Sequence, residues 1–280
     1  MARPHIDYLQ TQALPWQESA WKRLPGCRVK TLSQDPDSGA VSLLVRYPSG
    51  WSAPSPAPLA TAEELFVLEG LLELDGRRYG QDCYGWFPPG CRHAVRTAAT
   101  GAVALQFFGA APDAGAATPG PARTTADGEL VDAFELPWSD GSGSAAFGGA
   151  GRRSKTLHGS LDGDAATLLV ASPPHQHPPG WCAPQEIHPC AVELFLLSGE
   201  LLSPVGPMAA GGYCWRPPRV AHGPAASRGG NMALVRTHGP LRATEHTAHE
   251  LRLEREPAYE PVLPDGLRAL RGRPWRPQRY

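Results

Sequence analysis

The stretch ELFVLEG at residues 64–70 returns later in the chain as ELFLLSG at residues 193–199. Each copy is a short apolar run that begins with a glutamate and ends at a glycine, a pattern typical of a β-strand followed by a turn. Chance is a poor explanation for a second copy of a seven-residue pattern. It indicates that the chain contains one structural unit twice.

Further blocks recur in the same order around these two strands. LPW at residues 14–16 returns at 136–138, and KTL at 30–32 returns at 155–157. The pattern Tyr-x-Trp-x-Pro-Pro, ending at a histidine, occurs at 84–93 and again at 213–222. Constant order with slowly drifting spacing is what duplication followed by small changes in loop length produces.

These repeats divide the chain into four parts. Repeat one is expected at 12–110 and repeat two at 133–242, joined by a linker at 111–132 that is rich in Ala, Pro, Gly and Thr. A tail follows at 243–280, with a short helix expected near 246–254. Within each repeat, short apolar runs alternate with Gly-, Asp- and Pro-rich turns. Each repeat is therefore expected to be a closed or sandwiched antiparallel sheet.

Composition excludes several classes of protein. The formal net charge of −1 gives no field that would attract nucleic acid or an anionic membrane. No apolar run approaches the length that spans a bilayer, and the N-terminus lacks a signal-peptide pattern. The six cysteines form no C-x-x-C pair, so free thiols are expected rather than a disulfide framework. A cytoplasmic protein that acts on a small molecule is the default expectation.

The repeated blocks resemble the two motifs of the cupin superfamily. The first motif is Gly, five residues, His-x-His, three or four residues, Glu, six residues, Gly; the second is Gly, five residues, Pro-x-Gly, two residues, His. The resemblance implies an all-β fold of two tandem cupin barrels (double-stranded β-helix, or jelly roll), with short helical or irregular termini. The Tyr213–Pro224 wording is also similar to bacterial cupins grouped with the cupin domain of zinc-binding anti-sigma factors.

Repeat two carries the metal-binding motif in altered form. In this superfamily the two histidines and the glutamate of the first motif, with the histidine of the second, hold one divalent metal. Counting from Gly180 places Glu186 at the first histidine position and His188 at the second, and Glu193 at the glutamate position; the second motif supplies His222. Counting back from Gly199 instead places Val192 at the glutamate position. A one-residue slip reverses the face of a strand, so this alternative stays open.

Repeat one keeps the spacing and loses the ligands. Pro56 and Pro58 occupy the two histidine positions, and proline cannot ligate a metal. Glu63 and His93 remain, which is too few for a tight site. The first barrel is expected to be structural.

The leading hypothesis is a metal-dependent enzyme with its chemistry in repeat two. His188, His222, Glu193 and Glu186 would be the ligands, with Glu186 serving either as a ligand or as a general base. Such a set suits Fe(II) best, with Mn, Ni or Zn as alternatives. By analogy with similar small cupins, the reaction would be a dioxygenase-type oxidation of a diketone or aromatic ketone.

Alternatives remain open. One is a non-catalytic metal- or ligand-sensing cupin, and another is a structural bicupin without metal. Arg219, which replaces the motif glycine, is either an anchor for an anionic substrate or an ordinary surface arginine. Dimers through sheet edges are common in the superfamily, so the resemblance also suggests a homodimer.

Overall fold

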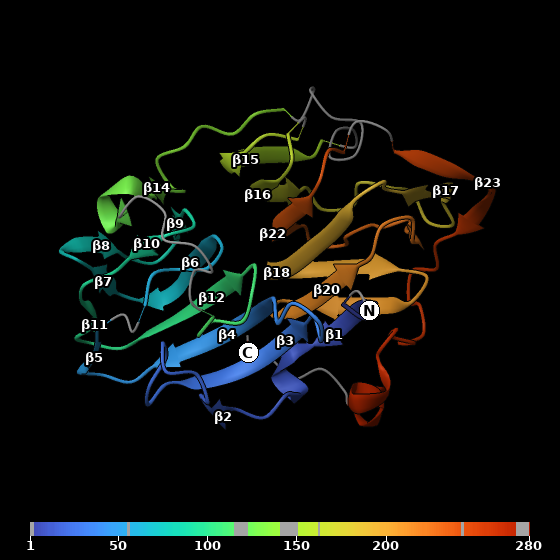
Figure 1. Ribbon diagram of the computed structural model, residues 1–280. Coiled ribbons are helices and arrows are strands. Elements are labelled where there is room, and N and C mark those ends of the chain that lie inside the picture. Colours follow the sequence, from blue (N-terminus) through green and yellow to red (C-terminus); the bar gives the residue numbers. More distant parts are fainter. Residues whose placement is uncertain are drawn as a thin grey trace. The chain divides into compact units, whose positions relative to one another are not determined.

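The computed structural model describes residues 3–54, 57–114, 123–140, 151–161, 163–241, 244–272 and 280. Strands dominate these residues, and their helices are three short 3-10 turns, Thr11–Ala13 (η1), Thr125–Asp127 (η2) and Asp265–Leu270 (η3). No helix among the described residues is long and apolar enough to cross a membrane. The expected all-β class is confirmed (Figure 1).

The chain divides into two compact units. Unit 1 contains residues 1–3 and 15–136, and unit 2 contains residues 4–14 and 137–280. Each unit has one large antiparallel sheet, a smaller sheet and its own apolar core. The internal repeat of the sequence therefore corresponds to two similar folded units.

In unit 1 the large sheet has seven strands in the order β14-β9-β6-β12-β4-β3-β2, and a four-stranded sheet has the order β5-β11-β7-β8. The strands of unit 1 are β2 (Gln17–Glu18), β3 (Arg28–Gln34), β4 (Val41–Tyr47), β5 (Trp51–Ala53), β6 (Glu63–Gly70), β7 (Leu72–Leu74), β8 (Arg77–Tyr79), β9 (Cys83–Phe87), β10 (Cys91–Arg92), β11 (Arg96–Ala98), β12 (Ala102–Phe108), β13 (Arg123–Thr124) and β14 (Glu129–Asp132).

In unit 2 the large sheet follows the order β1-β20-β18-β22-β16-β15, with β19 paired to β18, and a three-stranded sheet has the order β21-β17-β23. The strands of unit 2 are β1 (Ile6–Gln10), β15 (Arg153–Gly159), β16 (Ala166–Ser172), β17 (Cys182–Ile187), β18 (Ala191–Ser203), β19 (Gly206–Ala209), β20 (Gly212–Arg216), β21 (Ala221–His222), β22 (Asn231–His238) and β23 (Glu245–Arg252).

The structure differs from the expected boundaries at the edge strands. Residues 123–132, assigned above to the linker, form β13, η2 and β14, and β14 pairs with β9 in unit 1. Strand β1, which precedes repeat one, pairs with β20 in unit 2, where Figure 1 shows it in blue beside the orange strand. In both units the added strand covers the edge of the sheet, whose backbone groups would otherwise lack partners.

The expected helix at 246–254 is wrong. Those residues form most of β23, which pairs antiparallel with β17 from Cys182 to Ile187. The pairing satisfies the edge of a short sheet, and this tertiary demand outweighs the modest helix propensity of the segment. The tail is thereby part of unit 2, and the backbones of Asp7 and Val262 exchange hydrogen bonds of 2.8 and 3.1 Å.

The glycine that ends each repeated strand has a backbone role. Gly70 and Gly199 have φ values of +78° and +75°. A Cβ atom would lie 2.2 Å from the carbonyl oxygen of Gly101 at the first position and 2.0 Å from that of Gly230 at the second. Only glycine combines a left-handed backbone with such close approach of another chain segment.

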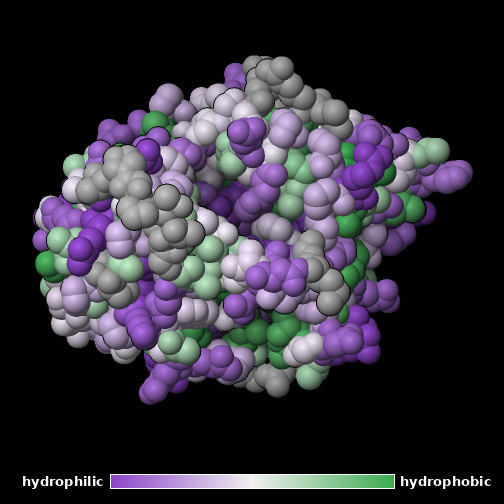
Figure 2. All heavy atoms as spheres, in the orientation of Figure 1, coloured by the Kyte–Doolittle hydropathy of each residue, from purple (hydrophilic) through white to green (hydrophobic). Residues whose placement is uncertain are grey.

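Each core is built from the inward side chains of its own sheets. Unit 1 buries Leu43, Leu65 and Val67, and unit 2 buries Leu168, Leu196 and Val235. Figure 2 shows hydrophilic residues spread over the surface, with hydrophobic residues gathered in smaller groups between them. The cavity described next opens among the inward side chains of unit 2.

Candidate metal centre

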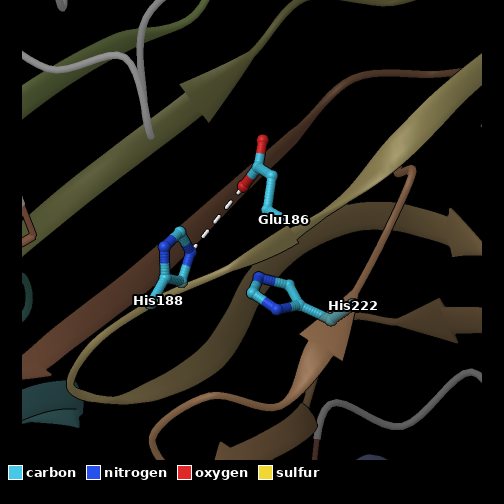
Figure 3. Close-up of side chains that lie close together, drawn as sticks. All are labelled: Glu186, His188 and His222. Carbon is cyan, nitrogen blue, oxygen red and sulfur yellow. Dashed lines mark ion pairs between the residues drawn. The ribbon is translucent and has the colours of Figure 1, made fainter. Parts of the chain in front are cut away.

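Three side chains with metal-ligating atoms converge in unit 2. Glu186 lies on β17 and His188 directly follows that strand, so their spacing of two places both on one face. His222 lies on β21, where it pairs in register with Glu186. Their ligand atoms all lie within 4.8 Å of one another, and Figure 3 shows the three side chains pointing toward a common point.

The three groups lie close together. Nε2 of His188 lies 3.7 Å from Oε2 of Glu186. The two imidazole rings are 4.7 Å apart at their centroids and inclined by 60°. His188 is buried, while Glu186 and His222 are half-buried. This spacing leaves room for an ion at the point of convergence.

Hydrogen bonds at Nδ1 orient both imidazoles. Nδ1 of His188 lies 3.1 Å from Oγ1 of Thr244, whose hydroxyl donates to the carbonyl of Leu241 at 3.4 Å. Nδ1 of His222 lies 3.2 Å from the carbonyl oxygen of Val220. These acceptors assign the Nδ1–H tautomer to both rings and leave Nε2 as the free lone pair. Such a partner on the second nitrogen is the usual arrangement around a metal-binding histidine.

The electrostatic environment keeps both histidines neutral. Burial, assisted by the charge of Arg216, lowers the pKa of His188 to about 4 and that of His222 to about 3. Burial raises the pKa of Glu186, against the opposing effect of Arg152. Neutral imidazoles are competent ligands at neutral pH, and a buried carboxylate gains most from a neighbouring cation. The donor set therefore fits a divalent metal.

The triad forms part of the wall of a cavity of about 330 Å³. Apolar side chains from β16, β18 and β22 form much of the wall, and Arg216, Ser203 and Asn231 add polar groups. His177 and Trp181 also line the cavity, with their rings stacked at 3.5 Å. A cavity that combines an apolar wall with convergent polar groups is the usual form of a small-molecule site.

Glu193, expected above to be a ligand, does not lie in this group. Val192 lines the cavity, so alternation along β18 puts Glu193 on the other face of the sheet. There Oε1 of Glu193 accepts a 2.6 Å hydrogen bond from Tyr213, and its other oxygen is bonded to Arg236. The internal repeat already indicated this, because it aligns Glu193 with Glu64, whereas the glutamate at the metal-motif position of repeat one is Glu63.

Unit 1 confirms that register. Tyr84 donates a 2.7 Å hydrogen bond to Glu64, as Tyr213 does to Glu193. The inward Glu63 instead lies 3.5 Å from His93, with both side chains fully buried. Among the described residues, Glu186, His188 and His222 are the only group of three ligand-type side chains this close together. Pro56 lies outside the described residues.

Sequence reasoning missed three residues that shape the cavity: Asp7, Tyr8 and Arg216. Tyr8 and Arg216 line it, and Asp7 forms an ion pair with Arg216 at 2.8 Å. Asp7 and Tyr8 could not be placed because β1 lies outside the repeat. The sequence could have indicated Arg216. It points to the opposite face of the strand from its neighbour Trp215, and it occupies the position that the apolar Phe87 has in unit 1.

Arg219, considered above as an anion anchor, lies on the surface. Its guanidinium forms hydrogen bonds of 3.1 and 3.0 Å with the two oxygens of the exposed Glu245. It is not among the residues that line the cavity.

Comparisons with known proteins support the fold. The sequence profile of the ChrR cupin-like domain matches residues 5–112. No curated protein sequence matches the chain. A candidate dioxygenase from Nostoc punctiforme superposes with a TM-score of 0.71 at 19% identity, over 90% of this chain and 91% of that one.

Two further solved structures are similar over most of the chain. Protein Ylba of Escherichia coli gives a TM-score of 0.56 at 14% identity, covering 86% of this chain and 93% of its own. Oxalate decarboxylase from Bacillus subtilis gives 0.53 at 13% identity, covering 86% and 78%. With the repeated motifs and the two β-sheet units, these matches show that the chain has the cupin fold, with residues 5–112 matching the ChrR cupin-like domain.

Proposed function

We propose that unit 2 is a metal-dependent enzyme, most closely a dioxygenase-type oxidoreductase that acts on a small oxygenated organic molecule. The observation that carries the proposal is the convergence of two neutral imidazoles and one carboxylate on the wall of a cavity. Two histidines and one carboxylate with open coordination positions are the ligand set of non-haem Fe(II) oxygenases. Fe(II) is therefore favoured, and Mn, Ni and Zn are the alternatives to be measured against it.

Each residue of the centre has a defined task. His188 and His222 would hold the ion through Nε2, each ring fixed by its Nδ1 partner. Glu186 would be the anionic ligand, or a general base when substrate takes its place. A bound Fe(II) would supply coordination of dioxygen and of substrate oxygens. The apolar side chains of Val170, Val192 and Leu196 would exclude water from the reacting groups.

Val192 occupies the motif position that holds a glutamate ligand in other cupins, and this favours a centre with open coordination positions. A fourth protein ligand would leave fewer positions for substrate and dioxygen. The similarity of the fold to the Nostoc candidate dioxygenase is consistent with the proposal, although at 19% identity it speaks for the fold alone.

The test has two arms. Metal content of purified protein is measured for the wild type and for His188→Ala and His222→Ala, and the wild type alone is expected to hold about one ion per chain. Oxygen consumption is then measured with the Fe(II)-loaded protein and a panel of diketones, aromatic ketones and 2-oxo acids. Iron-loaded protein that never consumes dioxygen with any of them would refute the dioxygenase.

A second candidate function is a non-catalytic cupin that binds a metal or small ligand and reports it to a partner. The match of residues 5–112 to the ChrR cupin-like domain favours it. Metal-loaded protein that binds a ligand, consumes no dioxygen and co-purifies with a partner would support this second candidate. A purely structural bicupin would hold no metal in the first arm of the test.

A further inference from the structure

Arg216 is an arginine that the fold itself does not require. Cys214 and Arg216 face the inside of unit 2, since Tyr213, which alternates with them, bonds to Glu193 on the other face of the sheet. The matching position of unit 1 is Phe87, an apolar residue of that core. An apolar side chain can therefore fill this inward position of the strand, so packing alone does not explain why unit 2 has a buried guanidinium there.

Only part of this guanidinium is used by the protein. Nε and Nη2 of Arg216 donate to Oδ1 of Asp7 at 3.2 and 2.8 Å, and Nη2 also lies 3.8 Å from Sγ of Cys214. Within the described part of the chain, Nη1 has no hydrogen-bond partner. Arg216 lines the cavity and Asp7 does not, so Nη1 is the donor of this guanidinium that remains for a ligand in the cavity.

Arg216 lines the same cavity as Glu186, His188 and His222. After burial, its charge is the next cause of the lowered pKa of both His188 and His222. Glu186 is the one acidic residue among the described residues that line the cavity, whereas two arginines, Arg152 and Arg216, line it. With Asp7 neutralising Arg216 and a divalent ion outweighing Glu186, the cavity would carry net positive charge. That balance favours an anionic guest.

We propose that this cavity binds a small organic carboxylate whose carboxylate group accepts hydrogen bonds from Nη1 of Arg216, while a second oxygen function reaches the centre formed by Glu186, His188 and His222. The inference rests on the proposed function, because the metal centre defines the other end of the ligand. It narrows the substrate from ketones in general to 2-oxo or 2-hydroxy acids. The volume of about 330 Å³ is at the lower end for ligand sites and restricts the guest to a small molecule.

The test compares each acid with its neutral ester. Pyruvate, phenylpyruvate and 2-oxoglutarate, and the fully esterified methyl ester of each (the dimethyl ester for 2-oxoglutarate), are titrated calorimetrically into Fe(II)-loaded protein under nitrogen, so that binding rather than turnover is measured. For the wild type, at least one acid is expected to bind at least about tenfold more tightly than its ester, the usual strength of a charge-assisted pair.

The variants distinguish loss of the contact between Arg216 and the ligand carboxylate from a loss of protein stability. Removing Arg216 alone would leave Asp7 as a buried unpaired charge, so the test uses the double variant Asp7→Asn/Arg216→Met, which removes both charges together. The preference for acid over ester is expected to fall below about threefold in this variant. Arg219→Met removes a surface arginine paired with Glu245 and is expected to retain the full preference.

The outcomes distinguish the two proposals. Wild-type protein that holds iron but binds every ester as tightly as its acid would overturn the carboxylate anchor and leave the metal centre standing. Protein that holds no iron would overturn the proposed function, and the same titrations in metal-free protein would then decide the Arg216 contact alone. A double variant that keeps iron and keeps the full preference would overturn the role of Arg216.

Discussion

Asp7 and Arg216 are 209 residues apart in the chain and form a buried ion pair, with Oδ1 2.8 Å from Nη2. The pair joins β1 to β20, whose backbones are paired at Ile6 and Trp215. The N-terminal strand is thereby fixed to unit 2 by an electrostatic contact as well as by the ladder of the sheet.

We expect Asp7→Ala to reduce the free energy of unfolding of unit 2 by about 3–5 kcal/mol, because it leaves the Arg216 charge buried and unpaired. Denaturant unfolding followed by circular dichroism measures the change. The matched control is Asp265→Ala, whose 2.7 Å pair with Arg268 is exposed and is expected to change stability by less than about 1 kcal/mol. Equal effects of the two substitutions would contradict the buried pair.

The same pair predicts a pH dependence of stability. Burial alone would raise the pKa of Asp7, but the charge and hydrogen bonds of Arg216 outweigh it and hold the pKa below its ordinary value of 3.8. The unfolded chain then binds the proton more readily than the folded one. The stabilisation is therefore present above about pH 4 and is lost as the pH falls through the lower, folded pKa.

Asp7→Asn provides the comparison for this pH dependence. The difference in unfolding free energy between wild type and Asp7→Asn is expected to shrink as the pH is lowered from about 5 to about 3. Other acidic groups contribute equally to both proteins and cancel in the difference. A constant difference over this range would show that the pKa of Asp7 is not depressed.

The register of β18 predicts which glutamates hold metal. Glu186→Ala is expected to lower metal affinity by at least about tenfold, because it removes one of three ligands. Glu193→Gln is expected to keep the metal, since Glu193 bonds to Tyr213 and Arg236 on the other face of the sheet. Metal content after dialysis against a chelator measures both. Loss of metal from Glu193→Gln would mean that the register is shifted by one residue.

The backbone of Gly199 predicts a cost that no side-chain contact reveals. Gly199→Ala is expected to destabilise unit 2 by at least about 2 kcal/mol, since φ is +75° and the added methyl group would meet the carbonyl of Gly230 at 2.0 Å. Gly229→Ala is the control, because a Cβ there meets nothing within 4 Å. Thermal unfolding of the two variants compares them. A Gly199→Ala protein as stable as its control would contradict the described turn.

The repeat predicted the fold because its matched residues perform matched tasks in both units. Nζ of Lys30 lies 4.9 Å from the ring centroid of Trp16, and Nζ of Lys155 lies 4.8 Å from that of Trp138. These are the KTL and LPW blocks that the sequence aligned. Cation–π pairs and glycines with a restricted backbone require particular residue types. Both copies of the repeat therefore keep these residues, and the sequence shows them at matching positions.

The parts that sequence reasoning could not reach depend on pairing over long separations. Nothing in the composition of residues 6–10 indicates that β1 joins unit 2, because a short apolar strand fits the edge of either sheet. The face of Glu193 depended on a single-residue count, and the two glycines of the motif gave conflicting answers. Geometry decided it, since His188 and Val192 line the cavity and Glu193 does not.

Val192 offers a test in which a ligand is added rather than removed. It lines the cavity beside the triad and corresponds to Glu63, the inward glutamate of unit 1. Val192→Glu would add a carboxylate to the same wall as a fourth ligand, beside Glu186, His188 and His222. We expect metal affinity to rise by at least about tenfold. Competition with a chelator measures the change.

The same substitution should make folding depend on the metal. Without an ion, the new carboxylate would share the cavity wall with the carboxylate of Glu186 and lose part of its hydration, so we expect metal-free Val192→Glu to be less stable than metal-free wild type by roughly 1–3 kcal/mol. Adding the ion should restore most of the loss, because an ion that binds only the folded state stabilises it. If metal neither binds more tightly nor restores stability, Val192 does not face the point where Glu186, His188 and His222 converge.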